Sequence, residues 1–192
     1  MKKLFSGGLL VCCLLLAARG ATADETVVKV TPGLIENGGF EGAYVELKDD
    51  YGFLAPGWIV RDGYYPWGLW SADPDSPHGG RFSQKMEIKA KIPKGTQQNN
   101  NRPLSRNKEY IFSLWHKGLA GSVSLIGFQW NPRKDILLID DTAPAGKFEP
   151  GSNWAKYEIK FQPAEDCVNF VLRISAPGPG TIWIDDVSLT EQ

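Results

Sequence analysis

Two adjacent carboxylates near the end of the chain, Asp185 and Asp186, are the clearest candidates for site chemistry. Successive side chains of a strand point to opposite faces of a sheet. If Val187 and Leu189 face the core, Asp185 lies on their side and Asp186 on the other. A buried carboxylate without a partner is costly. Because no basic residue is patterned to face Asp185, we expect a bound cation, and Ca²⁺ is the natural oxygen-seeking ion outside cells.

The second candidate group is aromatic. Four rings gather in a turn-rich segment, on Tyr64, Tyr65, Trp67 and Trp70. Trp115 lies in a predicted strand, where apolar alternation places it opposite the core side, among polar neighbours. Rings outside a core offer flat apolar surfaces on which a ligand can stack. Loop rings can also cap the end of a domain, so both interpretations stay open here.

Other patterns indicate other chemistry less well. Three acidic pairs could act as the paired carboxylates of glycoside hydrolysis: Asp49-Asp50, Asp73 with Asp75, and Asp140-Asp141. Turn residues surround them, so solvated turns are the favoured interpretation. His78 and His116 are too few and too far apart in the sequence to predict a zinc site. The sequence holds no nucleophile elbow, phosphate loop or dinucleotide fingerprint.

The elements that must position these residues are predicted to be short strands. No window sustains the i, i+3, i+4, i+7 apolar spacing of a helix, and Pro- and Gly-rich turns separate the alternating segments. The predicted strands are Val27–Val30, Gly57–Val60, Phe82–Ile88, Lys108–Lys117, Val123–Trp130, Trp154–Gln162, Cys167–Ser175 and Thr181–Leu189. The fold class is therefore all-β.

Alternation also predicts which side chains of these strands face the core. The inward sets are Tyr110, Phe112 and Leu114; Ile126, Phe128 and Trp130; Tyr157, Ile159 and Phe161; and Val168, Phe170, Leu172 and Ile174. Polar residues fill most of the alternate positions, so each of these strands is expected to have one solvated face.

The first 23 residues have the layout of an export signal. Lys2 and Lys3 precede the apolar run Leu9–Ala18, which is too short to span a bilayer, and Ala21–Ala23 offers a cleavage site. A lipoprotein signal using a cysteine of that run fits less well. We therefore predict a secreted or periplasmic protein, with no membrane-spanning segment once the signal is removed, whose single domain covers residues 24–192.

Removal of the signal changes both charge and cysteine content. The net charge falls from -1 to about -4, because Lys2, Lys3 and Arg19 are lost, and this argues against nucleic acid and anionic membranes as partners. Only Cys167 remains, so no internal disulfide can form. Stability must then come from a core or from a metal.

Six motifs along the chain occur in a recognisable order: Leu34–Glu41 (LIENGGFE), Pro56-Gly57-Trp58, Pro77–Ser83 (PHGGRFS), Tyr110–Lys117 (YIFSLWHK), Trp154–Tyr157 (WAKY) and Trp183–Leu189 (WIDDVSL). In this order the sequence resembles the carbohydrate-binding modules of families 4, 9 and 22. The resemblance implies a galactose-binding-domain-like jelly roll of two antiparallel sheets. It also implies that Trp58, Trp154 and Trp183 occupy core positions.

The same resemblance implies a set of site residues. Glu41 and Asp185 match carboxylates that hold a structural Ca²⁺ in such modules, and carbonyls of the Gly79-Gly80 turn would complete its shell. The residues expected to contact sugar are Trp115, Trp67, Trp70, Tyr64, Tyr65, Gln98 and Arg173. A flat apolar platform with a few placed polar groups is what an oligosaccharide requires.

Three functions follow from these expectations. The first is a non-catalytic module that recognises a polysaccharide or oligosaccharide near a cell or a partner glycoside hydrolase. The second is a jelly-roll scaffold, associated with the envelope, that binds a protein partner or a matrix component. The third is a small glycan-active enzyme that uses one of the acidic pairs. Specificity depends on loop geometry, so the sequence does not identify the glycan.

Overall fold

A computed structural model describes residues 33–48, 51–61, 68–128, 136–139 and 146–192. Several predictions made from the sequence fall outside these ranges. They are the export signal, the strand Val27–Val30, the rings of Tyr64, Tyr65, Trp67 and Trp130, and the acidic pairs Asp49-Asp50 and Asp140-Asp141. These predictions remain as they were stated.

Strands make up the regular structure of the described chain, and no helix occurs among its elements. The strands are β1 (Val45–Glu46), β2 (Phe53–Leu54), β3 (Ile59–Arg61), β4 (Gly68–Asp73), β5 (Ser83–Ile88), β6 (Lys94–Asn100), β7 (Tyr110–Gly118), β8 (Gly121–Phe128), β9 (Ile136–Ile139), β10 (Lys147–Phe148), β11 (Gly151–Phe161), β12 (Asn169–Ala176) and β13 (Gly180–Glu191). In these ranges nothing has the helical length and apolar character needed to cross a bilayer.

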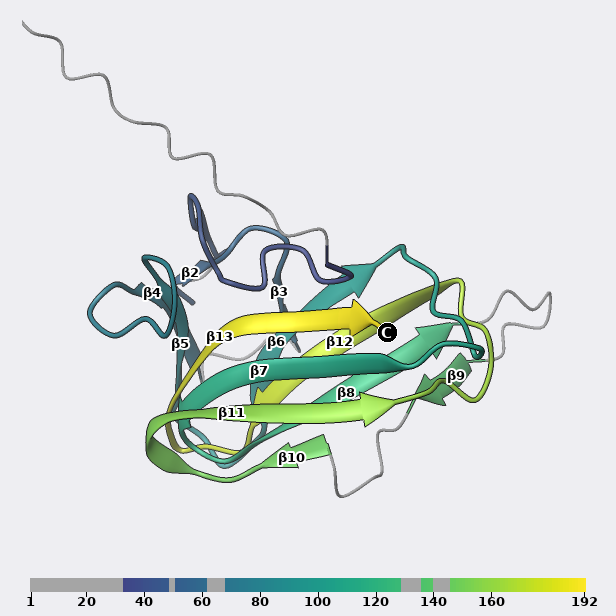
Figure 1. The fold of residues 1–192 in the computed structure, drawn as a ribbon. Helices are drawn as coiled ribbons and strands as arrows, with labels where there is room; N and C mark the ends of the chain where they lie inside the picture. The colour runs from purple at the N-terminus through teal and green to yellow at the C-terminus, as the bar shows by residue number, and fades with distance from the viewer. Residues whose placement is uncertain (1–32, 49–50, 62–67, 129–135, 140–145) are drawn as a thin grey trace, which may run out of the picture.

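The strands form two antiparallel sheets and a small hairpin. The five-stranded sheet has the order β11-β7-β13-β5-β4, and the six-stranded sheet has the order β10-β8-β12-β6-β3, with β9 also paired to β8. β1 and β2 form the hairpin. In Figure 1, β13, β7 and β11 lie in front of β6, β12 and β8, so the sheets are stacked as two layers. The predicted all-β jelly-roll sandwich of two antiparallel sheets is confirmed.

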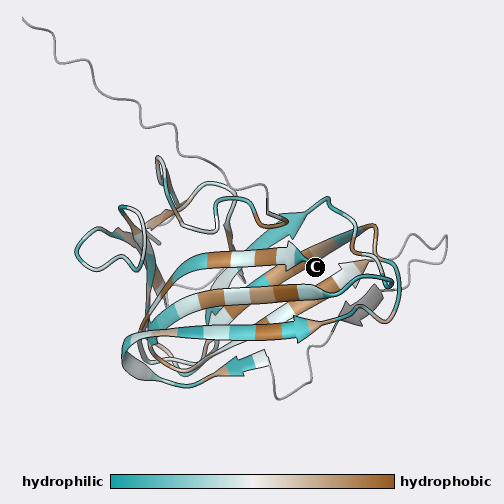
Figure 2. Ribbon diagram, viewed as in Figure 1, coloured by the Kyte–Doolittle hydropathy of each residue, from teal (hydrophilic) through white to brown (hydrophobic). Residues whose placement is uncertain are grey.

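The core lies between the two sheets. Phe112 and Leu114 of β7 face Leu172 and Ile174 of β12 across the layers, and all four side chains are buried. Figure 2 shows the alternation of apolar and polar residues along β7 and β13. Full burial of one such side chain contributes about 1.5–3 kcal/mol to stability. The predicted inward faces of the strands that became β7, β11 and β12 are confirmed, with the exception of Val168.

Among the residues predicted to lie in the core, Trp58 does so, whereas Val168, Trp154 and Trp183 do not. Trp58 is buried and stacks on Phe40 at 4.8 Å between ring centroids, as expected of a core residue. Val168 precedes β12 and is 46% exposed, because the strand pairing that would turn it inward begins only at the next residue. Trp154 and Trp183 are half-buried, and their rings lie over the cation of Lys117 on the outer face of the five-stranded sheet.

The inward orientations predicted for Ile126 and Phe128, in the strand that became β8, are also wrong. Val123 and Leu125 join the core, whereas Ile126 is paired with Val171 and Phe128 with Asn169, on the outer face of the six-stranded sheet. This strand is apolar on both faces, so alternation could not distinguish its inner side from its outer side.

A β-bulge in β13 changes the faces predicted for the two adjacent carboxylates. The register of β13 against β7 shifts between Asp185 and Ser188, and Asp186 has a positive φ of 45°. A bulge adds a residue to one strand and breaks its alternation. Asp185 is therefore opposite Trp115 on the outer side of the sheet, not on the core side. Its side chain is nevertheless 0% exposed, because a loop covers it.

Candidate functional site

The outer face of the five-stranded sheet carries three tryptophans, Trp115, Trp154 and Trp183, and we call it the tryptophan face. The imidazole of His78 stacks on Trp115, with ring centroids 3.8 Å apart and an angle of 17° between the planes. Trp115 does lie opposite the core, as predicted. One face of its ring is already occupied by the chain itself, so the expected sugar-stacking surface is reduced.

The other two rings of the tryptophan face also have partners within the chain. The ammonium of Lys117 lies 4.9 Å from the ring centroid of Trp154 and 4.8 Å from that of Trp183. Lys117 also donates to Ser76, and the indole N–H of Trp183 donates to Asp73. Cations near indole rings are attracted by the ring quadrupole. These contacts hold the loop around residues 73–80 on the sheet, so this face is built for stability.

The same interactions decide the role of one acidic pair. Asp73 accepts the indole N–H of Trp183 through one carboxylate oxygen and the amide of Asp75 through the other, at 2.9 Å. The pair is therefore a structured turn, in agreement with the interpretation favoured from the sequence.

Asp185 lies beneath this loop and is held by backbone amides. Its Oδ2 accepts from the amides of His78 at 2.9 Å and Gly79 at 3.1 Å, and its Oδ1 accepts from the amide of Asp186 at 2.8 Å. Burial raises the pKa of Asp185 to about 6, although these hydrogen bonds act in the opposite direction. A carboxylate with this balance is one that a nearby cation would stabilise in its charged form.

Glu41 comes from the segment 33–42, and its side chain contacts the residues that directly follow this loop. Its Oε1 accepts from the amides of Arg81 at 2.5 Å and Phe82 at 3.1 Å. Gly80 has φ of 60°, and a Cβ on it would lie only 2.1 Å from that oxygen. The structure thus brings Glu41, Asp185 and the Gly79-Gly80 turn to one loop. It is the amide of Gly79 that faces Asp185, and the described ranges contain no group of three or more His, Cys, Asp or Glu side chains arranged to hold a metal.

Two of the predicted sugar-contacting residues are buried. Trp70 is 1% exposed and belongs to the core, since residues 68–73 form β4 and pair it with Met86. Gln98 is also 1% exposed, on the core side of β6 opposite Leu172. Its side-chain oxygen accepts from the amide of Glu36 at 2.9 Å, and its nitrogen donates to the carbonyl of Glu36. The structure therefore places neither of these two side chains at the molecular surface.

Arg173 is the predicted sugar-contacting residue that reaches an open surface. It lies on the outer side of β12, opposite Gln97 of β6 and Ser124 of β8. Its Nε donates to the Gln97 side-chain oxygen at 3.1 Å, and the Gln97 amide donates to Asn99 at 3.3 Å. We call this outer side of the six-stranded sheet the amide face. Asn99 on it is exposed, and Gln97 and Arg173 are half-buried.

Apolar side chains flank the polar row of the amide face. Ile59 of β3 lies opposite Gln97 and is 46% exposed, and Val171 and Phe128 lie on the other side of the row. Apart from Arg173, sequence analysis missed this surface. The alternation of Gln97 and Asn99 in a run of amides was the available signal, but no apolar partner residues marked that run as a strand.

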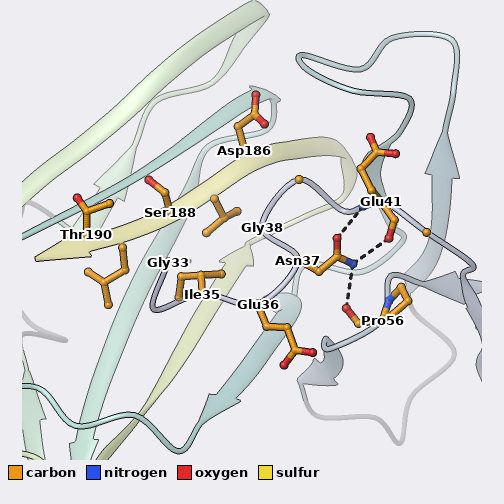
Figure 3. Close-up of a pocket in the computed structure, with 14 residues that line it drawn as sticks. Gly33, Ile35, Glu36, Asn37, Gly38, Glu41, Pro56, Asp186, Ser188 and Thr190 are labelled. Atoms are coloured by element: carbon orange, nitrogen blue, oxygen red, sulfur yellow. Dashed lines mark hydrogen bonds between the residues drawn. The ribbon is translucent and has the colours of Figure 1, made fainter. Parts of the chain in front are cut away.

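A cavity of about 640 Å³ lies on another side of the molecule, between the segment 33–42 and the last residues of β13 (Figure 3). The side chain of Asn37 shapes it by donating to the carbonyls of Glu41 and Pro56, both at 3.0 Å. Glu36, Glu41 and Asp186 contribute carboxylates to its lining. None of the described residues that line it is aromatic, so it offers no ring for stacking.

A family model of carbohydrate-binding domains (CBM_4_9) matches residues 32–181. The chain belongs to this family. A polar row with flanking apolar side chains is the kind of surface that such domains need for a ligand rich in hydroxyl groups. None of the curated proteins matches the chain.

Several solved structures with a similar fold are carbohydrate-binding or sugar-binding proteins. A family 16 carbohydrate-binding module shares 20% identity, with a TM-score of 0.52 over 82% of this chain and 99% of the module. The CBM22-1 xylan-binding domain from Paenibacillus barcinonensis shares 12% identity, with a TM-score of 0.51 over 70% and 85%. A putative sugar-binding protein from Bacteroides thetaiotaomicron shares 13%, with a TM-score of 0.56 over 83% and 100%. At these identities the likeness establishes the fold.

Proposed function

We propose that this protein binds a polysaccharide or oligosaccharide on the amide face and does not cleave it. The observation that carries the proposal is the row of Arg173, Gln97 and Asn99, which are linked to one another and face outward. Planar amide and guanidinium groups donate and accept along fixed directions, as recognition of sugar hydroxyls requires. The neighbouring side chains of Ile59 and Phe128 supply apolar surface for the C–H faces of the sugar rings.

Stacking on aromatic loop residues is a further part of this proposal. The segment with Tyr64, Tyr65 and Trp67 follows directly after β3, which is the edge strand of the amide face. We assign the stacking role to these rings in preference to Trp115, because His78 occupies one face of the Trp115 ring.

Affinity electrophoresis of the purified protein over a panel of polysaccharides tests the proposal. We expect retardation by at least one glycan, lost in Gln97→Ala with Arg173→Ala and weakened in Trp67→Ala. Lys160→Ala is the matched control, because Lys160 is exposed on the other sheet and pairs with Glu109. A folded protein that no glycan retards, but that captures a protein partner, would instead support the scaffold function.

We also propose a structural Ca²⁺ at the loop that joins Glu41 and Asp185. Support comes from donors that are all oxygen, from the burial of Asp185 and from its raised pKa. The ion would neutralise carboxylates that amides alone now satisfy. Thermal unfolding with and without EDTA is the test: added Ca²⁺ should raise the midpoint in the native protein and leave that of Glu41→Gln unchanged. An unfolding midpoint that neither EDTA nor Ca²⁺ changes would show that the amide donors stabilise the carboxylates without an ion.

Export through the N-terminal signal completes the proposal. Sequencing the N-terminus of protein recovered from the periplasm or medium should find a start near Asp24. Retention in the cytoplasm with an intact leader would contradict it.

A further inference from the structure

The amide face has an unusual charge distribution. Among the outward side chains that the structure describes on β6, β12 and β8, Arg173 is the single charged group. At the sheet edge, Lys147 of β10 is exposed and lies opposite Ser122. No carboxylate belongs to the outward positions described on these four strands, so the face carries only positive charge.

The tryptophan face differs, because two of its cations are paired with carboxylates. Lys85 lies 2.5 Å from Glu87, and Lys156 lies 2.5 Å from Glu158. Lys85 and Lys156 thus each have an acidic neighbour on their own strand, whereas Lys117 lies near the rings of Trp154 and Trp183. Arg173 has no acidic partner among the described residues, and its Nε donates to Gln97.

That hydrogen bond also orients the guanidinium group. Gln97 holds the Nε edge, and no described residue accepts from the two terminal nitrogens. A guanidinium presents its N–H groups as a planar fork that matches a carboxylate with two parallel hydrogen bonds. A half-buried cation without an acidic partner gains more from such an anion than a fully solvated one does.

We propose that the ligand of the amide face is an acidic glycan, and that Arg173 binds the carboxylate of a uronic acid residue in it. This inference rests on the proposed function and names its substrate class. The chain as a whole has a net charge of -1, so it does not attract polyanions by its overall charge. Selection of an acidic glycan must then come from the local positive charge of this face. Gln97 acts as a positioning residue for Arg173, and Asn99 is placed to bind a neighbouring hydroxyl.

The test compares polymers that differ only in charge. Binding of polygalacturonate is measured beside the same polymer with its carboxyl groups reduced, and alginate is treated likewise. We expect the native protein to bind the acidic form roughly 10- to 100-fold more tightly, as one charge-assisted contact allows. Arg173→Gln should remove this preference, and Arg173→Lys should restore part of it, because lysine keeps the charge but lacks the fork. Gln97→Ala should reduce the preference by a smaller factor.

Two controls separate this contact from general attraction. Arg106→Gln removes an exposed cation that pairs with Glu165 and should leave the preference unchanged. Dextran sulfate tests whether any polyanion suffices, and binding as tight as that of polygalacturonate would overturn the uronate assignment. Circular dichroism checks that each variant is folded.

The outcomes distinguish the inference from the function on which it rests. Equal affinity for acidic and reduced polymers, with binding still lost when Arg173 and Gln97 are both replaced, overturns the acidic ligand and keeps sugar binding. A folded protein that binds neither these polymers nor any neutral glycan overturns both.

Discussion

The two outer faces of this sandwich differ in how many of their side chains already interact with other residues of the chain. The tryptophan face has the larger rings, but Trp115, Trp154 and Trp183 stack on His78 or surround Lys117. The amide face has smaller and more polar groups, and Arg173 there keeps donors that no described residue accepts. If the amide face binds the ligand as proposed, a count of aromatic residues points to the other sheet. Groups with unused hydrogen-bonding capacity are the better guide to a ligand surface.

The loop around residues 73–80 is the cause of this difference. It crosses the five-stranded sheet, places His78 on Trp115, and donates its amides to Asp185. A buried carboxylate that is satisfied in this way keeps the loop closed over the sheet. The described residues show no comparable hydrogen bonds from a loop to the row of Gln97, Asn99 and Arg173.

The largest effect is expected on glycan affinity, when substitutions on the two faces are compared. Gln97→Ala combined with Arg173→Ala should weaken glycan binding by roughly 100-fold, since two polar contacts are lost. Trp154→Ala should change the affinity by no more than about 2-fold, which is less than the loss of a direct polar contact would cause. Isothermal titration calorimetry with the best glycan of the panel measures both. The reverse order of effects would place the ligand on the tryptophan face.

Stability should respond in the opposite sense. Trp183→Ala removes a half-buried ring, its contact with Lys117 and its hydrogen bond to Asp73. We expect a loss of about 2–3 kcal/mol of unfolding free energy, somewhat below that of a fully buried tryptophan. Urea unfolding monitored by fluorescence measures it. Arg173→Ala, the matched variant on the amide face, should cost less than about 1 kcal/mol. Equal losses would contradict a division of the two faces into stabilising and binding surfaces.

A substitution in the loop tests whether closure depends on its backbone. In Gly80→Ala the added Cβ would lie within 2.1 Å of Glu41 Oε1, at a residue whose φ is 60°. The loop must shift or Glu41 must release its amides, and we expect a cost of about 1–2 kcal/mol. Gly151→Ala is the control, because a Cβ there meets nothing closer than 3.7 Å. Comparable unfolding midpoints for the two variants would show that the loop adapts freely.

The smallest effect concerns pH and a histidine of the core. His116 is buried against Phe148, with ring centroids 4.3 Å apart, and burial lowers its pKa below the usual 6.5. Unfolded chains then bind the proton more tightly than folded ones, so the stability contribution is complete above pH 6.5 and decreases below it. Asp185, with a pKa raised to about 6, acts oppositely: its protonation adds stability as the pH falls from about 6 toward 3.8.

Replacing the histidine separates these two opposing contributions. The difference in unfolding midpoint between the native protein and His116→Gln should change between pH 7.5 and pH 5, with the native protein losing more on acidification. Asp185 is present in both proteins, so its titration cancels in the comparison. A difference that stays constant with pH would show that the pKa of His116 is the same in the folded and unfolded states.

The strands that alternation predicted well are those with one apolar face. β5, β7 and β12 lie close to their predicted limits because apolar residues at every second position specify both the strand and its inner side. β6 was missed, since its sequence is mostly amides and its buried positions include Gln98 and Lys94. β4 was taken for an aromatic loop because Trp70 followed a cluster of other rings.

The candidate site was harder to predict because its geometry depends on contacts distant in sequence. Asp185 was correctly expected to be buried, but the reason was wrong, because a bulge reverses the alternation and a remote loop covers the carboxylate. Arg173 was placed correctly on the outer side, and its partner Gln97 could not be identified without the pairing of β6 and β12. The sequence could not predict that His78 covers Trp115, since the two residues are far apart along the chain.

The short segment before the hairpin has a mechanical consequence. Its Glu36 is bonded on both backbone groups to Gln98 of the six-stranded sheet, while Leu34 and Gly38 are bonded to Leu189 and Val187 of the five-stranded sheet. This segment therefore connects the two sheets by hydrogen bonds along one side of the sandwich. The layers cannot slide past each other in shear without breaking these bonds together. A force that a bound ligand exerts on one sheet would therefore be transmitted to the other sheet through these hydrogen bonds.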